Sequence, residues 1–168
     1  MFIIAVVSGQ AYNPGMDNST ATDQINTKPA DVVVRGNASG FLQEVVSGKH
    51  HLRADEPVSA GGNDAAPGPY DYVLIALGVC ISMTVGFYAR RKQWLLENIV
   101  VSLRHSRIYA RDCEECETKE GMLDRIDVEI ELTGSLTAEQ HAKLMEIAGK
   151  CPVHRTLTSE INIRLRPV

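Results

Sequence analysis

The alternation of hydrophobic and polar positions predicts short strands in the first third of the chain. Two β-branched runs, 31–35 and 41–46, flank the turn-forming segment 37–40, which predicts a β-hairpin. Residues 50–54 are compatible with a third short strand. The connection 55–69 that follows is rich in Gly and Pro, and a Pro just before an apolar run signals the start of a helix.

An uncharged apolar run occupies residues 72–89. Its length makes it a candidate membrane span, but it sits at the lower edge of spanning length. It is also the only such run, and it contains the small or polar residues Gly78, Ser82, Thr84 and Gly86. We interpret it as a helix buried in a globular fold, because a helix that is apolar all round can equally form a core. The basic residues 90–92 suit its C-terminal end.

The pattern then returns to strands. Residues 99–103 and 108–109 predict one long strand with a bulge near His105, and residues 122–132 alternate as a half-buried strand does. The charged segment 112–120 between them predicts a loop or hairpin tip.

Two helices and a last strand complete the pattern. Residues 137–140 form a capping box that opens a helix, with Leu144, Ile147 and Ala148 on one face. Cys151 and the following Pro start a short helical turn, and residues 161–165 alternate as a final strand. The order predicts an α+β fold in which an antiparallel sheet covers one long buried helix.

Composition narrows the class of protein. The 168 residues suffice for one domain, and residues 9–30 show no apolar period, so we expect a mobile leader (1–30) and a single domain (31–168). The net charge of −4 argues against a nucleic-acid partner. The apolar start carries no basic residue before it, so no secretory signal is evident. A cytoplasmic, reducing compartment is therefore expected, where paired cysteines are more often catalytic or metal-binding than structural.

The cysteines are the candidate chemistry. Cys80 lies in the middle of the apolar run, where a free Cys is usually core filler. Cys151 begins a short helix, whose N-terminus would lower the pKa of its thiol, and His154 and Arg155 follow it. A structural role for Cys151 is an equally good interpretation from the local sequence.

Cys113 and Cys116 have the CxxC spacing of half a zinc site or of a redox pair. His105 is a candidate third ligand, but no complete ligand set is present. Acidic neighbours disfavour the thiolate, which makes this pair a weak candidate for redox catalysis.

Two segments together resemble the OsmC/Ohr family, the osmotically induced and organic hydroperoxide resistance proteins. Residues 68–84, which surround Cys80, are similar to its central-helix signature, and residues 150–157, which include Cys151, are similar to its second signature. Residues 55–62 and 112–116 resemble the OsmC-like branch. The resemblance covers about residues 31–168.

The resemblance implies an intertwined homodimer with active sites at the subunit interface. It implies that the thiolate of Cys80 cleaves the O–O bond of an organic hydroperoxide and becomes a sulfenic acid, that Cys151 condenses with it to a disulfide, and that a lipoyl-type dithiol or small thiol reopens this bond. No cofactor, metal ion or membrane is expected to take part.

The sequence departs from the family's peroxidases around Cys80. Those proteins place a Glu ten residues before the first Cys, where this chain has Tyr70, followed by Asp71. Asp71 could instead favour the helix N-terminus. Their Arg from the N-terminal strands matches Arg35 best, and Arg53 second. Two alternatives stay open: a non-catalytic stress protein that binds a small hydrophobic or sulfur-containing ligand at the dimer interface, and a metal-binding protein.

Overall fold

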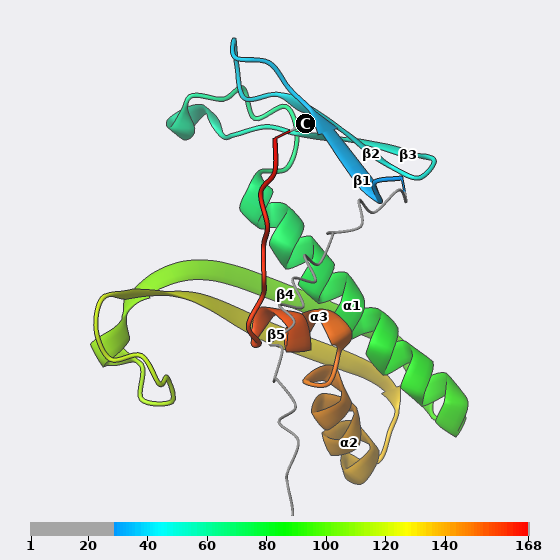
Figure 1. Ribbon diagram of the computed structural model, residues 1–168. Coiled ribbons are helices and arrows are strands. Elements are labelled where there is room, and N and C mark those ends of the chain that lie inside the picture. Colours follow the sequence, from blue (N-terminus) through cyan, green and yellow to red (C-terminus); the bar gives the residue numbers. More distant parts are fainter. Residues whose placement is uncertain (1–28, 168) are drawn as a thin grey trace, which may run out of the picture. The chain divides into compact units, whose positions relative to one another are not determined.

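An antiparallel sheet of three short strands forms the N-terminal part of the computed structural model, which describes residues 29–167 (Figure 1). Its order is β1-β2-β3, and the two-residue turn after β2 uses Gly48 at a φ of +57°. The predicted hairpin and third strand are therefore confirmed, and the predicted leader falls almost wholly outside the described residues. The strands are β1 (Val32–Arg35), β2 (Gln43–Ser47) and β3 (His50–Ala54).

The carboxylate of Asp55 organises the loop that follows β3. Asp55 is only 2% exposed, and it accepts backbone N–H hydrogen bonds from Glu56 (2.9 Å), Asn63 (3.1 Å) and Ala65 (3.1 Å). A buried carboxylate requires such partners because its desolvation is otherwise costly. The loop, which includes the short 3-10 helix η1 (Val58–Ala60), is thereby closed just before the long helix begins.

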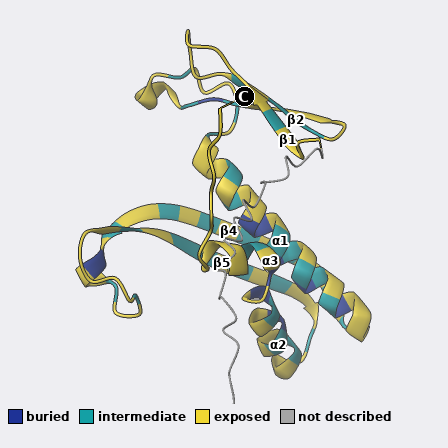
Figure 2. Cartoon of the chain, in the orientation of Figure 1, coloured by how far each residue is buried: buried dark blue, intermediate teal, exposed yellow. Residues whose placement is uncertain are grey.

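The long helix α1 (Pro69–Lys92) is buried along one side only (Figure 2). Pro69 takes the first helical position, and the basic residues 90–92 lie in the last turn, as predicted. Its buried stripe recurs every fourth residue, the spacing of one helix face. By length and composition alone α1 could also cross a membrane, but within its chain it packs against β4, α2 and α3. The buried residues are Leu77, Gly78, Ile81, Val85 and Ala89.

A long two-stranded ribbon packs against α1. β4 (Leu95–Tyr109) pairs antiparallel with β5 (Met122–Ser135), and the short 3-10 helix η2 (Ala110–Asp112) lies in their connection. Both strands are longer than the alternation predicted. The predicted bulge near His105 is wrong, because the register shifts between Leu96 and Asn98 instead.

Two short helices close the core. In α2 (Ala138–Ala148) the predicted capping box is confirmed, since Gln140 N–H donates to Thr137 Oγ1 at 3.2 Å and Gln140 Oε1 accepts from Thr137 N–H at 3.0 Å. Leu144 and Ala148 of α2 join the buried stripe of α1. Helix α3 (Pro152–Leu157) begins directly after Cys151, as predicted.

The predicted α+β class with antiparallel strands and one long helix is confirmed. Two features differ from the prediction. The strands form two separate sheets, and residues 161–165 form no strand in the described chain. Alternation alone does not make a strand, because the backbone needs a ladder partner. The apolar side chains of this segment, Ile161, Ile163 and Leu165, are exposed.

Replacing Asp55 tests whether its carboxylate stabilises the loop between β3 and α1. Burial alone raises the pKa of Asp55, but the N–H groups of Ala65, Asn63 and Glu56, with the charge of Arg53, hold it below its ordinary value. A lowered folded pKa gives stability that is present above the unfolded pKa of about 4 and is lost as the pH falls through the folded value. We expect Asp55→Asn to lower the Tm by several degrees at pH 7.

That difference in Tm between the variant and the parent chain should shrink as the pH falls from 5 to about 2, which thermal melts followed by circular dichroism measure. Glu131→Gln, which neutralises an exposed carboxylate on β5, is the matched control. Equal melting of Asp55→Asn and the parent at pH 7 would show that the loop does not depend on this carboxylate.

Candidate two-thiol site on the long helix

Cys80 lies halfway along α1, at the border of the core. It is partly buried and packs against the buried stripe of α1. The apolar run places it there, because a helix of this length brings its middle turns alongside both β4 and the α2–α3 segment. Cys80 is therefore close to the core without being sealed inside it.

Cys151 is fully buried, with 0% of its surface exposed, and it is the N-cap residue of α3. Its Sγ accepts a hydrogen bond from the backbone N–H of His154 at 3.2 Å. Pro152 suits the first helical position because it has no N–H to satisfy. The contact with His154 is thus made by the backbone.

The fold brings the thiols of Cys80 and Cys151 together. The two are free cysteines, and Cys80 packs against the buried cluster that contains Cys151. Burial raises the pKa of the Cys151 thiol, and the neighbouring Cys80 adds to the rise, whereas the N–H groups of His154 and Val153 oppose it. The sequence-based expectation of a lowered pKa at Cys151 is corrected here, because desolvation outweighs the N-terminus of a short helix.

The acidic candidate Asp71 is a helix-capping residue. Its Oδ2 accepts the backbone N–H of Gly68 at 2.9 Å, at the start of α1. An α-helix rises about 1.5 Å per residue, so Asp71 and Tyr70 lie about 14 and 15 Å along the axis from Cys80. Neither side chain spans that distance to a sulfur on the same helix.

The arginine candidates lie in the N-terminal sheet. Arg35 is opposite Glu44 on β2, and Arg53 of β3 is opposite the same Glu44 on its other side. This cross-strand arrangement of unlike charges stabilises the sheet. A role for Arg35 at Cys80 stays a prediction.

The weak metal candidates do not come together. Cys113 and Cys116 form a disulfide. His105 instead places Nε2 2.9 Å from Oδ1 of Asp124. Within residues 29–167, no group of three or more His, Cys, Asp or Glu side chains is arranged to hold a metal ion.

An aromatic contact near the start of α1 escaped the sequence analysis. The rings of Tyr70 and His105 stack, with centroids 4.5 Å apart and planes within 12°. The signal was available in the alternation of β4, because His105 continues the helix-facing series of Ile99, Val101 and Leu103. Asp124 on β5 holds the other edge of His105, so Tyr70 is fixed where related peroxidases carry an acid.

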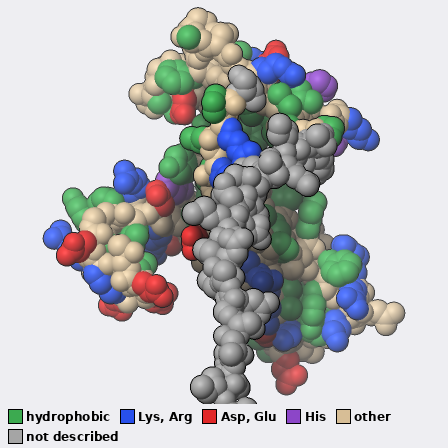
Figure 3. Space-filling model, viewed as in Figure 1, with side chains coloured by type: hydrophobic (Ala, Val, Ile, Leu, Met, Phe, Trp, Pro, Cys, Tyr) green, Lys and Arg blue, Asp and Glu red, His purple; other side chains and the backbone are tan. Residues whose placement is uncertain are grey.

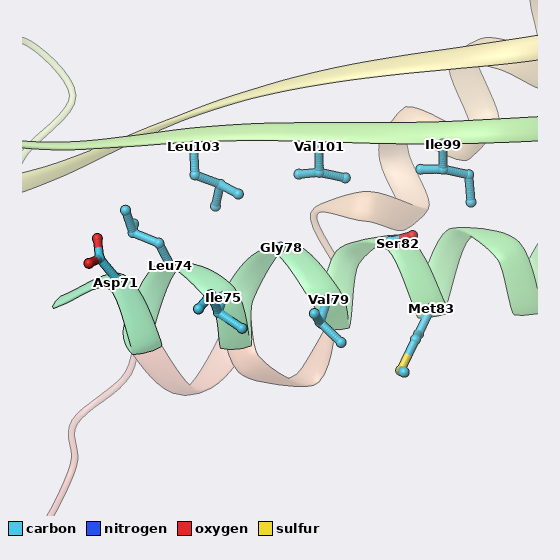
Figure 4. A pocket seen from close by; sticks show the side chains of 10 residues that line it. All are labelled: Asp71, Leu74, Ile75, Gly78, Val79, Ser82, Met83, Ile99, Val101 and Leu103. Atoms are coloured by element: carbon cyan, nitrogen blue, oxygen red, sulfur yellow. The ribbon is translucent and has the colours of Figure 1, made fainter. Parts of the chain in front are cut away.

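A groove of about 510 Å³ runs between α1 and β4 (Figure 4). From β4, Ile99, Val101 and Leu103 point toward the helix. Gly78 permits this close approach, because a Cβ there would lie 2.7 Å from Cδ1 of Leu103. Cys80 does not line the groove. The groove residues on α1 are Asp71, Leu74, Ile75, Gly78, Val79, Ser82 and Met83.

The outer side of α1 is apolar and exposed. Met83 is 68% exposed, and hydrophobic side chains are visible along the lower part of α1 beside the basic groups of its C-terminal turn (Figure 3). Exposed apolar patches of this kind usually mark an interface. The exposed apolar residues of α1 are Tyr70, Val73, Ile75, Val79, Met83 and Phe87.

Comparison with known proteins identifies the family of this chain. The sequence model of the family described as OsmC-like protein matches residues 61–166. The chain therefore belongs to the OsmC-like protein family. A comparison with curated protein sequences finds no match.

Solved structures share the fold at low sequence identity. An OsmC-like protein from Mycoplasma pneumoniae has a TM-score of 0.60 and 19% identity, over 78% of this chain and 88% of that one. The organic hydroperoxide resistance protein OsmC of Legionella pneumophila gives 0.55 and 19%, over 76% and 87%. The organic hydroperoxide resistance protein of Bacillus subtilis gives 0.53 and 16%, over 78% and 91%.

The unequal burial of the two thiols predicts an order of alkylation. In the folded, mildly reduced protein, we expect iodoacetamide to modify Cys80 well before Cys151, because Cys151 is sealed and its raised pKa keeps it protonated. Peptide mass spectrometry at timed intervals measures the order. In denaturant the two cysteines should react at similar rates, and faster modification of Cys151 in the folded protein would contradict the structure.

Proposed function

We propose that this protein reduces organic hydroperoxides, with Cys80 as the attacking thiol and Cys151 as the resolving thiol. The observation that carries the proposal is that the free thiols of Cys80 and Cys151 share one hydrophobic cluster, with Cys80 at its border and Cys151 buried in it. Membership of the OsmC-like family and likeness to structures described as organic hydroperoxide resistance proteins support it.

The different environments of the thiols suit different steps. The thiolate of Cys80 attacks one peroxide oxygen, the O–O bond breaks, and the alkoxide leaves as an alcohol after taking a proton. Cys80 is then a sulfenic acid. The Cys151 sulfur attacks the Cys80 sulfur, and the hydroxyl group leaves as water with the Cys151 proton. A small or lipoyl-type dithiol reduces the resulting disulfide by exchange.

The reacting sulfur needs a cation, since a thiolate at the border of an apolar core is otherwise costly. Arg35 is the candidate, supplied by the N-terminal sheet of a second copy of the chain. Tyr70 and Asp71 lie about 15 Å from Cys80 along the same helix, so they can reach a Cys80 only in another copy of the chain. Tyr70, held by His105, and Asp71 would be presented in the same way.

A homodimer is supported by surfaces that the single chain leaves uncovered. The outer side of α1 exposes large apolar side chains, and so does the segment that contains Ile161, Ile163 and Leu165. A two-fold interface buries the same patch on both copies. We place the protein in the cytoplasm, where thiols are kept reduced.

A second candidate function is ligand binding without turnover. The groove between α1 and β4 is largely apolar, with Asp71 and Ser82 as polar groups, which is the make-up of a site for a small hydrophobic molecule. In that case hydroperoxide treatment would leave the thiols of Cys80 and Cys151 unchanged by mass spectrometry.

Turnover of cumene hydroperoxide with dihydrolipoamide tests the main proposal. Cys80→Ser should reduce consumption to background, because it removes the attacking sulfur. Cys151→Ser should still form a sulfenic acid on Cys80, which dimedone traps, but no internal disulfide. Cys113→Ser/Cys116→Ser is the control, because it removes the disulfide outside the site and leaves both thiols of the site. Full turnover by Cys80→Ser would overturn the proposal.

Mixing two inactive variants tests whether a site is shared between copies. Arg35→Ala and Cys80→Ser homodimers should each be inactive, and a mixture after subunit exchange should recover about a quarter of the parental activity. The recovery arises because each mixed dimer contains one site with both parental residues. A mixture that stays inactive although native mass spectrometry shows mixed dimers would rule out a shared Arg35–Cys80 site.

A further inference from the structure

The tip of the β4–β5 ribbon carries a second pair of cysteines, away from the two-thiol site. Between Tyr109, the last residue of β4, and Met122, the first of β5, the disulfide of Cys113 and Cys116 closes the connection. Both cysteine residues are partly exposed. They also line a hollow of about 440 Å³ at this tip, so a small molecule can approach the S–S bond.

Lys119 places a positive charge beside one end of this disulfide. Its ammonium donates to the carbonyl oxygens of Cys113 (3.2 Å) and Glu114 (3.3 Å). Since the carbonyl oxygen and Sγ of one residue are only a few bonds apart, the charge lies within about 8 Å of the Cys113 sulfur. That is within the screening length at physiological salt. The sequence neighbours of the two cysteines are acidic, and the folded loop brings the cation of Lys119 close to them.

The rim of the hollow is acidic. Among its lining residues, Arg125 is the basic side chain, and its Nη2 is already 2.8 Å from Oδ1 of Asp127. Acidic and basic side chains are both visible around this tip in Figure 3, and Asp112 and Asp124 lie 3.8 and 3.9 Å from Arg111 and Arg107. The acidic groups are in excess, and an excess of one sign concentrates molecules of the opposite sign and repels like charges. The acidic lining residues are Asp112, Glu114, Glu115, Asp124 and Asp127.

We propose that Cys113 and Cys116 form a second thiol–disulfide exchange site, which takes electrons from small neutral or cationic thiols and discriminates against anionic ones. The proposal does not rest on hydroperoxide reduction at Cys80. Its parts are an accessible disulfide, the Lys119 ammonium on the backbone of the same loop, and an excess of acidic side chains around the opening.

The charge of Lys119 favours the thiolate that leaves. An incoming thiolate attacks one sulfur of the disulfide, the S–S bond breaks, and the other sulfur leaves as a thiolate that the nearby ammonium of Lys119 stabilises, since the better-stabilised thiolate is the better leaving group. A second thiol attacks the mixed disulfide on the incoming sulfur and releases the remaining cysteine thiolate. Both cysteine sulfurs take a proton. Two electrons have then passed from two thiols, or one dithiol, to the protein, and the donor has become a disulfide.

Three monothiols of different charge test the selectivity: cysteamine (cationic), 2-mercaptoethanol (neutral) and mercaptoacetate (anionic). The full-length Cys80→Ser/Cys151→Ser variant leaves the tip pair as the reacting cysteines. Samples taken at intervals are quenched with acid and alkylated, and mass spectrometry measures how much disulfide remains. Each rate is corrected for the fraction of the added monothiol that is present as thiolate. We expect the rate to fall from cysteamine to mercaptoacetate by on the order of tenfold at low salt, and much less in 1 M salt.

Variants of the tip separate the two charge effects. Glu114→Gln/Glu115→Gln should narrow the spread between the three thiols. Lys119→Gln should slow exchange with all three by about threefold, and Lys119→Arg should restore it, because a less stabilised thiolate leaves more slowly. If the double cysteine variant does not fold, peptide mapping of residues 113 and 116 in the parent chain gives the same rates.

Equal corrected rates for the three thiols, or a disulfide that resists all of them over hours, would overturn the proposal. An unchanged rate in Lys119→Gln would overturn the role given to Lys119. No hydroperoxide is present in these experiments, so their result does not depend on whether the protein reduces hydroperoxides at Cys80.

Discussion

The buried stripe of α1 against Leu144 and Ala148 of α2 is the contact on which the two-thiol site depends. It fixes α1 beside the α2–α3 segment, and that segment carries Cys151 at the first turn of α3. Because Cys151 is itself part of the buried cluster, packing and chemistry share the same residues. The side chains of β4 and β5 that face α1 pack against the same cluster, so this core also anchors the ribbon.

Burial divides the work between Cys80 and Cys151. A sealed thiol with a raised pKa stays protonated and is protected from direct oxidation, which suits a group that acts second. Under the proposed function, the partly exposed thiol at the border is the one that a peroxide would reach first. The same border leaves one side of α1 uncovered, so the site and the surface proposed for a second copy lie on the same helix.

Much of the fold was predictable because local patterns carry it: the apolar run became α1, the capping box at Thr137 began α2, and Pro152 began α3. Features that depend on distant partners were not predictable. The pKa of Cys151 depends on burial by other elements. The contact of Lys119 with Cys113 depends on how the loop folds. Residues 161–165 had the alternation of a strand but no ladder partner. Cys151 was a candidate from its local sequence, whereas Cys80 was identified by family resemblance, since position alone favoured core filler for it.

The loop before α1 is held mainly through its backbone. Asp55 binds backbone N–H groups of Glu56, Asn63 and Ala65, and every residue except proline offers such a group. The glycines of the loop are less replaceable, because Gly61 has a φ of +93° and a Cβ on Gly62 would lie 1.9 Å from the carbonyl oxygen of Glu56. New side chains, and with them new surface chemistry, can therefore enter by mutation at the three N–H donors, while the start of the central helix stays where it is.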